Sequence, residues 1–123
     1  MLKVHAKNFG SVVILCLKGG IVRGETTTLR NAVISQSGVS VVVLDLGQVS
    51  IIDAGGLGVM LELRRQTQSK GIDFKLMNIN RPVSRVLEIT CLSSVFDVTS
   101  EAEILSAAQL GRRALMLELK RCA

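Results

Sequence analysis

The sequence predicts an α/β protein in which a mixed β-sheet of about five strands packs against about four α-helices. Short apolar runs rich in β-branched residues alternate with segments whose apolar residues recur at helical spacing. Two strands come first as a hairpin, so the sheet is expected to be mixed rather than fully parallel. With 123 residues, of which 48% are hydrophobic and 20% charged, the chain can bury the core of one domain.

The first half of the chain predicts an initial hairpin, a helix and a central strand. Residues 4–8 and 12–17 form the hairpin, and the glycine pair at 19–20 is expected to end its second strand. Residues 26–34 combine apolar and polar positions as an amphipathic helix does. Residues 41–46 are apolar on both faces, which is typical of a strand covered on both sides.

The second half alternates helices and strands. A helix over residues 57–70 is expected to end at Gly71, and residues 73–77 form the next strand. Asn80 and Pro82 open another helix, because an asparagine side chain caps free N–H groups and proline fits the first turn.

The end of the chain is less regular. Residues 95–98 predict a short strand, after which Ser100 and Glu103 form a capping box for a last helix. From Gly111 onward alternating leucines fit a strand, whereas the composition favours a continued helix. The sequence therefore predicts a domain over residues 1–110 and a basic C-terminal extension over residues 111–123.

The segment from Asp53 to Gly58 is the main candidate site. An acid and three glycines precede a helix here, and the first N–H groups of a helix are free to bind a side chain or a partner. Asp53 is expected to cap this helix through the N–H of Gly55 or Gly56 and to contact a partner at the exposed tip. A phosphate cradle is disfavoured, because a P-loop pattern is missing and Asp53 would repel an anion.

Composition argues against several function classes. The formal net charge is +5, with much of the excess near the C-terminus, and aromatic residues are too few for nucleic acid binding to be expected. The three cysteines and single histidine lack metal-ligand spacing, and no triad or cofactor loop is found, so no enzyme, metal or cofactor is expected. No leader and no apolar run of about 18 residues is found, which predicts a cytoplasmic protein without a transmembrane segment.

Seven stretches carry a family resemblance: residues 42–46, 49–53, 56–60, 70–71, 76–78, 86–92 and 95–98. Together they resemble a STAS domain, the fold shared by bacterial anti-sigma factor antagonists and the cytoplasmic tails of sulfate transporters. The resemblance covers roughly residues 4–109, which is most of the chain. It implies a STAS-like sheet and a regulatory, partner-switching role in transcription.

The resemblance to the antagonists implies a protein-binding module. In that family the residue after the aspartate is typically a serine or threonine, which an anti-sigma factor of the serine kinase type phosphorylates with its own ATP to end the complex. Ala54 and Gly55 stand here instead, so no phosphorylation is expected at Ala54 and binding would be constitutive. The implied surface combines the helix tip with adjoining loop residues: Ser50, Ile52, Asp53, Ala54, Gly55, Gly56, Leu57 and Gly58.

Other roles are compatible with the same residues. The missing hydroxyl also suits a STAS subunit of an ABC-type lipid-trafficking transporter, where a phosphoswitch is not expected. A scaffold subunit of a signalling complex would use residues 111–123, which could mediate a homodimer or contact acidic lipid. Phosphorylation of Ser50 in place of Ala54 is a further hypothesis.

Overall fold

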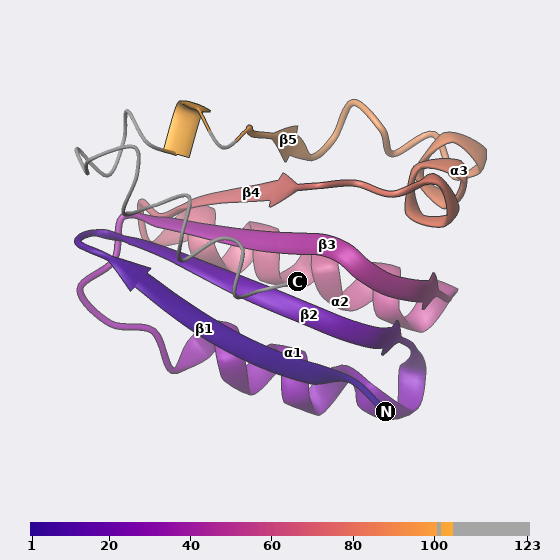
Figure 1. Cartoon of the computed structure of the whole chain (residues 1–123), viewed down its shortest axis with the longest axis horizontal. Helices are drawn as coiled ribbons and strands as arrows, with labels where there is room; N and C mark the ends of the chain where they lie inside the picture. The colour runs from indigo at the N-terminus through magenta and orange to yellow at the C-terminus, as the bar shows by residue number, and fades with distance from the viewer. Residues whose placement is uncertain (101, 105–123) are drawn as a thin grey trace.

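The computed structural model describes residues 1–100 and 102–104, and it shows a five-stranded sheet with helices packed against it (Figure 1). Its elements in chain order are β1 (Lys3–Phe9), β2 (Val12–Ile21), the 3-10 turn η1 (Arg23–Glu25), α1 (Thr26–Ile34), β3 (Val41–Ile52), α2 (Ala54–Ser69), β4 (Asp73–Met77), α3 (Arg81–Ile89) and β5 (Asp97–Val98). Residues 102–104 are helical. The predicted α/β class with a mixed sheet is confirmed.

The strand order places the starts of three helices together. The sheet runs β1-β2-β3-β4-β5, with β1 and β2 antiparallel and all other neighbours parallel. Parallel strands end at the same edge of a sheet, and a helix that follows such a strand begins at that edge. The loops that lead into α1, α2 and α3 therefore gather at one end of the molecule (Figure 1).

The two faces of the sheet belong to separate cores. On one face Leu15 and Leu44 belong to a cluster with Leu29, Met60 and Val83, which lie on α1, α2 and α3. The other face holds a smaller cluster of Phe9, Val12, Ile14, Cys16, Val43, Met77 and Ile104. Both faces of β3 are thus buried, as its continuous apolar sequence predicted.

Two strands are longer than the sequence predicted. The expected stop of β2 at the glycine pair is wrong, because the strand continues to Ile21 with an irregular register against β3. Gly19 has a φ of +112°, and a Cβ added there would fall 2.2 Å from the carbonyl oxygen of Met1. The glycine thus permits a bulge and a close backbone approach inside the strand. β3 likewise continues to Ile52, so residues 50–52 belong to a strand and the expected loop is wrong.

Local chemistry sets the helix ends much as predicted. Gly71, which follows α2, has a left-handed φ of +73°. The Asn80 Oδ1 accepts a hydrogen bond from the Val83 N–H at 3.0 Å and so caps α3. The Ser100 Oγ accepts one from the Glu103 N–H at 3.3 Å at the start of the next helical turn.

The last strand is shorter than the sequence predicted. β5 covers two of the four residues expected in the last strand. The predicted boundary at residue 110, the extension over 111–123 and its proposed homodimer contact lie outside the described residues. In the part of the chain that the structure describes, no helix is both long and apolar enough to cross a membrane.

Candidate functional site

The candidate site lies where β3 leads into α2. Asp53 is the N-cap of α2, because its Oδ1 accepts a hydrogen bond from the Gly56 N–H at 2.7 Å. Its Oδ2 accepts a second one from the Arg23 N–H of η1 at 3.1 Å. The predicted cap is confirmed, and the same carboxylate also ties the start of α2 to the loop between β2 and α1.

The two N–H donors hold a negative charge at this site. The Gly56 N–H, and after it the Arg23 N–H, lower the pKa of Asp53, because they stabilise the ionised carboxylate. The partial positive charge at the start of α2 acts in the same direction. Asp53 is therefore ionised at neutral pH and offers a fixed negative charge beside the helix start.

The three glycines of the tip serve different purposes. A Cβ added to Gly56 would fall 1.8 Å from the carbonyl oxygen of Ile21, and one added to Gly55 would lie 2.9 Å from the Cβ of Arg23. Around Gly58 no atom lies within 4 Å of such a Cβ. Close approach of α2 to β2 therefore requires Gly56 and favours Gly55, whereas Gly58 leaves bare backbone exposed on α2.

The predicted binding residues divide into a surface group and a buried group. Ser50, Ala54 and Gly58 are exposed, and Asp53 and Gly55 are partly exposed. Ile52, Gly56 and Leu57 are buried. The buried three can shape the tip from beneath, but only the surface group is available for direct contact.

Ile51 adds an apolar side chain to this surface. It is 54% exposed, whereas the next residue, Ile52, is 4% exposed, because successive residues of a strand face opposite sides. The sequence hid this alternation, since residues 50–52 were expected in a loop. We define the tip surface as Ser50, Ile51, Asp53, Ala54, Gly55 and Gly58.

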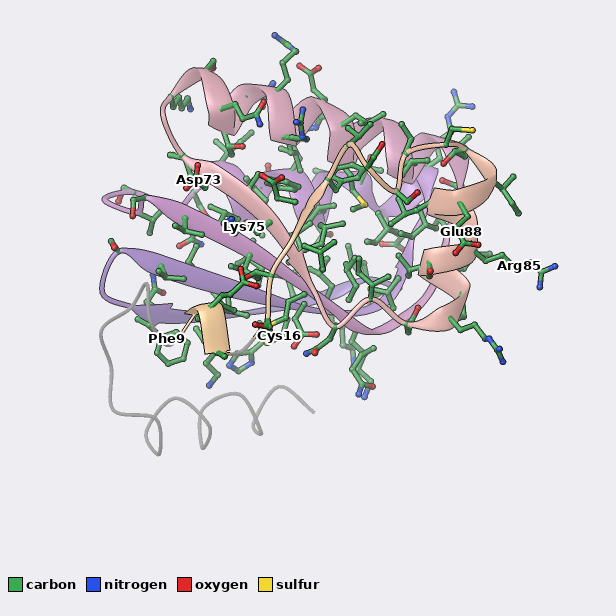
Figure 2. All side chains as sticks on the ribbon, turned by 90° about the horizontal axis from the view of Figure 1, so that it is seen from above. Phe9, Cys16, Asp73, Lys75, Arg85 and Glu88 are labelled. Carbon is green, nitrogen blue, oxygen red and sulfur yellow. The ribbon has the colours of Figure 1, made fainter. Side chains whose placement is uncertain are left out.

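A groove that sequence reasoning missed lies along α3, at the same end of the sheet. It measures about 650 Å³ and is lined mainly by Ile79, Arg81, Ser84, Arg85, Glu88 and Ile89. Figure 2 shows Arg85 and Glu88 on this helix, with Arg85 reaching outward. Helical spacing puts Arg81 and Arg85 on one face, but no pattern in the sequence reveals the hollow beside them.

Asn80 connects α3 to the central strand. Its side-chain N–H groups donate to the carbonyl oxygens of Leu46 at 3.1 Å and Val49 at 2.7 Å. These two carbonyls belong to the part of β3 that leads to the tip surface. The cap of α3 therefore also fixes the position of α3 relative to the tip.

The Asp45 carboxylate has a structural role, because its hydrogen bonds link two strands. Its Oδ1 accepts hydrogen bonds from the Gly47 N–H at 3.0 Å and from the Asn78 side chain at 3.3 Å. Asp45 thus holds the end of β4 against β3. Within residues 1–100 and 102–104, no three His, Cys, Asp or Glu side chains come together as metal ligands would.

Comparison with known proteins identifies the family. Residues 3–104 match the STAS domain family, which is most of the chain and includes the whole of the tip surface. The chain belongs to the STAS domain family. The resemblance drawn from the sequence is therefore confirmed.

Several solved structures share this STAS fold. A Thermotoga maritima protein assigned as an anti-sigma factor antagonist is 24% identical, with a TM-score of 0.75 over 87% of this chain and 95% of that one. The anti-sigma factor antagonist SpoIIAA in its unphosphorylated form is 18% identical, with a TM-score of 0.70 over 90% and 99%. A sulfate transporter family protein from Wolinella succinogenes is 19% identical, with a TM-score of 0.64 over 80% and 85%. At these identities the likeness shows the fold alone.

Proposed function

We propose that this STAS protein is a regulatory module that binds a partner protein through the tip surface and performs no catalysis of its own. The observation that carries the proposal is Ala54, which is exposed at the first position of α2 beside the ionised cap Asp53. The fold shared with the antagonist SpoIIAA and with a Thermotoga maritima protein assigned as an antagonist supports an anti-sigma factor as the partner, and the family resemblance implies one of the serine kinase type. The ATP belongs to that partner, so the complex forms in the cytoplasm.

The same residue makes the binding constitutive. Ala54 has no hydroxyl group, so a kinase cannot transfer phosphate to this position. A phosphate here would add a charge of about −1.5 to −2 next to the Asp53 carboxylate, and the repulsion would end the complex. Without it the tip surface stays in its unmodified, binding-competent form, and control of the complex has to come from another part of the system.

The absent hydroxyl also favours a second function. A STAS subunit that stays attached to an ABC-type ATPase of a lipid-trafficking transporter needs a binding surface but no phosphoswitch. The same fold occurs in a sulfate transporter family protein. The two functions share the tip surface and differ in the partner.

Affinity capture from a lysate of the source cells tests the proposal and separates the two functions. The bait variants are Ala54→Glu and Ile51→Glu, which add a negative charge to the tip surface. Glutamate in the first turn of a helix is favourable, so Ala54→Glu is expected to fold. Ser69→Glu adds the same charge at the exposed far end of α2 and serves as the matched control.

The identity of the captured protein decides between the partners. We expect the unaltered chain and Ser69→Glu to capture an ATP-binding anti-sigma factor. Both tip variants should capture at least about tenfold less of it, which corresponds to a lost contact of about 1.4 kcal/mol. Capture of an ABC ATPase with the same dependence on the tip would assign the second function. Equal capture by Ala54→Glu and Ser69→Glu would contradict binding at the tip.

A further inference from the structure

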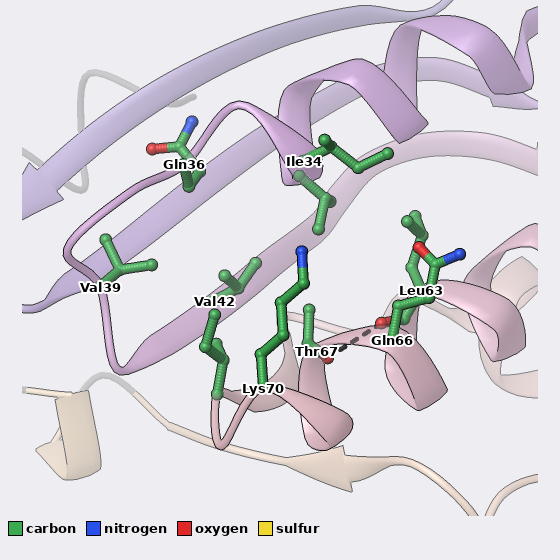
Figure 3. Close-up of a pocket in the computed structure, with 10 residues that line it drawn as sticks. Ile34, Gln36, Val39, Val42, Leu63, Gln66, Thr67 and Lys70 are labelled. Atoms are coloured by element: carbon green, nitrogen blue, oxygen red, sulfur yellow. Dashed lines mark hydrogen bonds between the residues drawn. The ribbon is translucent and has the colours of Figure 1, made fainter.

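A small cavity lies far from the tip, between the C-terminal ends of α1 and α2 (Figure 3). Its volume is about 50 Å³. The walls include Val33 of α1, Val42 of β3 and Leu63 of α2, which are 5%, 1% and 0% exposed. Ile72, which precedes β4, closes another side. The cavity is thus built from four separate segments of the fold.

The interior of the cavity is apolar. Thr67 is the buried polar residue in its lining, and its hydroxyl is already engaged with the carbonyl oxygens of Leu63 at 2.9 Å and Arg64 at 3.0 Å. The walls otherwise present methyl and methylene groups. A hollow without free polar partners holds water poorly and favours an apolar occupant.

The mouth of the cavity is polar and carries a positive charge. Figure 3 shows the Lys70 side chain extending from the end of α2 across the mouth towards α1. Among the described residues no ion pair involves its ammonium group. Gln36 and Gln66 flank the mouth, and each uses one side-chain N–H, to the Ala32 carbonyl and the Glu62 carboxylate respectively. Lys70 is therefore the charged group that the mouth presents to an anion.

The volume limits the size of an occupant. One water-sized group needs about 10–15 Å³ in this measure, so 50 Å³ admits a tail of about four carbon atoms. We propose that the cavity binds a short-chain carboxylate, with its branched aliphatic tail among Val33, Val42 and Leu63 and its carboxylate at Lys70. This site is separate from the tip surface, and the inference does not rest on the proposed function.

A titration followed by ¹H–¹⁵N NMR tests the site with isovalerate as the probe. At constant ionic strength, isovalerate is expected to shift the amide resonances of Val42, Leu63 and Ile72 in a saturable way. Burial of four carbons with one exposed ion pair corresponds to a Kd of about 1 mM. Isovaleramide, which has the same tail without the charge, should bind about threefold to fivefold more weakly, and formate, which has no tail, should not saturate.

Two variants separate the tail from the charge. Val42→Ile fills part of the cavity and should raise the Kd for isovalerate about fourfold, the factor for one methylene. Lys70→Met keeps the aliphatic stem and should raise the Kd to that of isovaleramide. Val98→Ile and Lys3→Met, at exposed positions on β5 and β1, are the matched controls and should leave the Kd unchanged.

Three results would overturn the inference. The first is the absence of a saturable shift at these resonances up to about 20 mM isovalerate, far above the expected Kd of about 1 mM. The second is equal affinity for isovalerate and isovaleramide. The third is a Kd that neither Val42→Ile nor Lys70→Met changes while the spectra show both variants folded.

Discussion

The close approach of α2 to β2 makes Gly56 a sensitive position for the whole tip. In Gly56→Ala the added Cβ would lie 1.8 Å from the Ile21 carbonyl oxygen, which is backbone and cannot rotate away. The same oxygen accepts a hydrogen bond from the Asp53 N–H at 3.3 Å. Relief of the clash therefore requires α2 to move off the sheet and the link between Asp53 and Ile21 to break.

The magnitude follows from three contributions. Overpacking against a rigid neighbour costs about 3 kcal/mol, and the lost backbone hydrogen bond costs about 1 kcal/mol. Alanine in a helix is favoured over glycine by about 1 kcal/mol, which offsets part of this. Gly56→Ala should therefore lose about 3 kcal/mol of unfolding free energy. Gly58→Ala meets no atom within 4 Å and should gain about 1 kcal/mol from helix propensity alone.

Urea and thermal unfolding followed by circular dichroism measure both effects. At about 4 °C per kcal/mol for a domain of this size, Gly56→Ala should melt about 12 °C lower and Gly58→Ala about 4 °C higher than the unaltered chain. The two variants add the same methyl group two residues apart, so each is the control for the other. Equal stability of the two variants would refute the seating of α2 on β2.

Three further predictions concern Asp53, Asn80 and Cys91. Asp53→Asn should destabilise at neutral pH. Because its pKa is lowered in the folded chain, the ionised carboxylate contributes fully to the free energy of unfolding above the ordinary aspartate pKa of about 4. This contribution is lost as the pH falls through the folded pKa. The difference in unfolding free energy between Asp53→Asn and the unaltered chain should therefore shrink in acid unfolding curves. Asn80→Ala removes a helix cap and two donors to β3, so it should lower the free energy of unfolding in urea by about 2–3 kcal/mol. Asn80→Ser restores a cap and should recover about 1 kcal/mol of this loss. Equal stability of the two variants would count against the cap. Cys91 has a left-handed φ of +60°, so Cys91→Gly should raise the unfolding free energy by about 1 kcal/mol, and a decrease would contradict backbone strain there.

The parts of the fold that the sequence predicts well are set by local chemistry. The caps at Asp53 and Asn80 follow from side chains that accept N–H bonds three residues ahead, and both are present. Gly71 ends α2 because glycine has no Cβ and therefore adopts the left-handed conformation without a steric clash. Such features depend on a few neighbouring residues, so a single sequence is enough to predict them.

The parts that it missed depend on segments far apart in the chain. β2 runs through Gly19 because its residues go on pairing with β3, and Gly19 leaves room for the backbone of Met1 beside it; no local pattern indicates either contact. Because β3 extends to Ile52, Ile51 faces outward and Ile52 is buried. The predicted set of binding residues therefore included both exposed and buried side chains. The groove along α3 is likewise a product of how the helix sits on β3, which the Asn80 side chain fixes.

The dependence of the captured complex on ATP shows whether Ala54 makes binding at the tip surface constitutive. The purified anti-sigma factor would be bound to the unaltered chain and to Ala54→Ser, which restores a hydroxyl at the exposed start of α2. Intact mass and size-exclusion chromatography would then follow both complexes after addition of magnesium and ATP. We expect the unaltered complex to persist without added phosphate, and the Ala54→Ser variant to gain one phosphate and dissociate. Phosphate added to the unaltered chain with release of the partner would contradict it, as would an Ala54→Ser complex that neither gains phosphate nor dissociates.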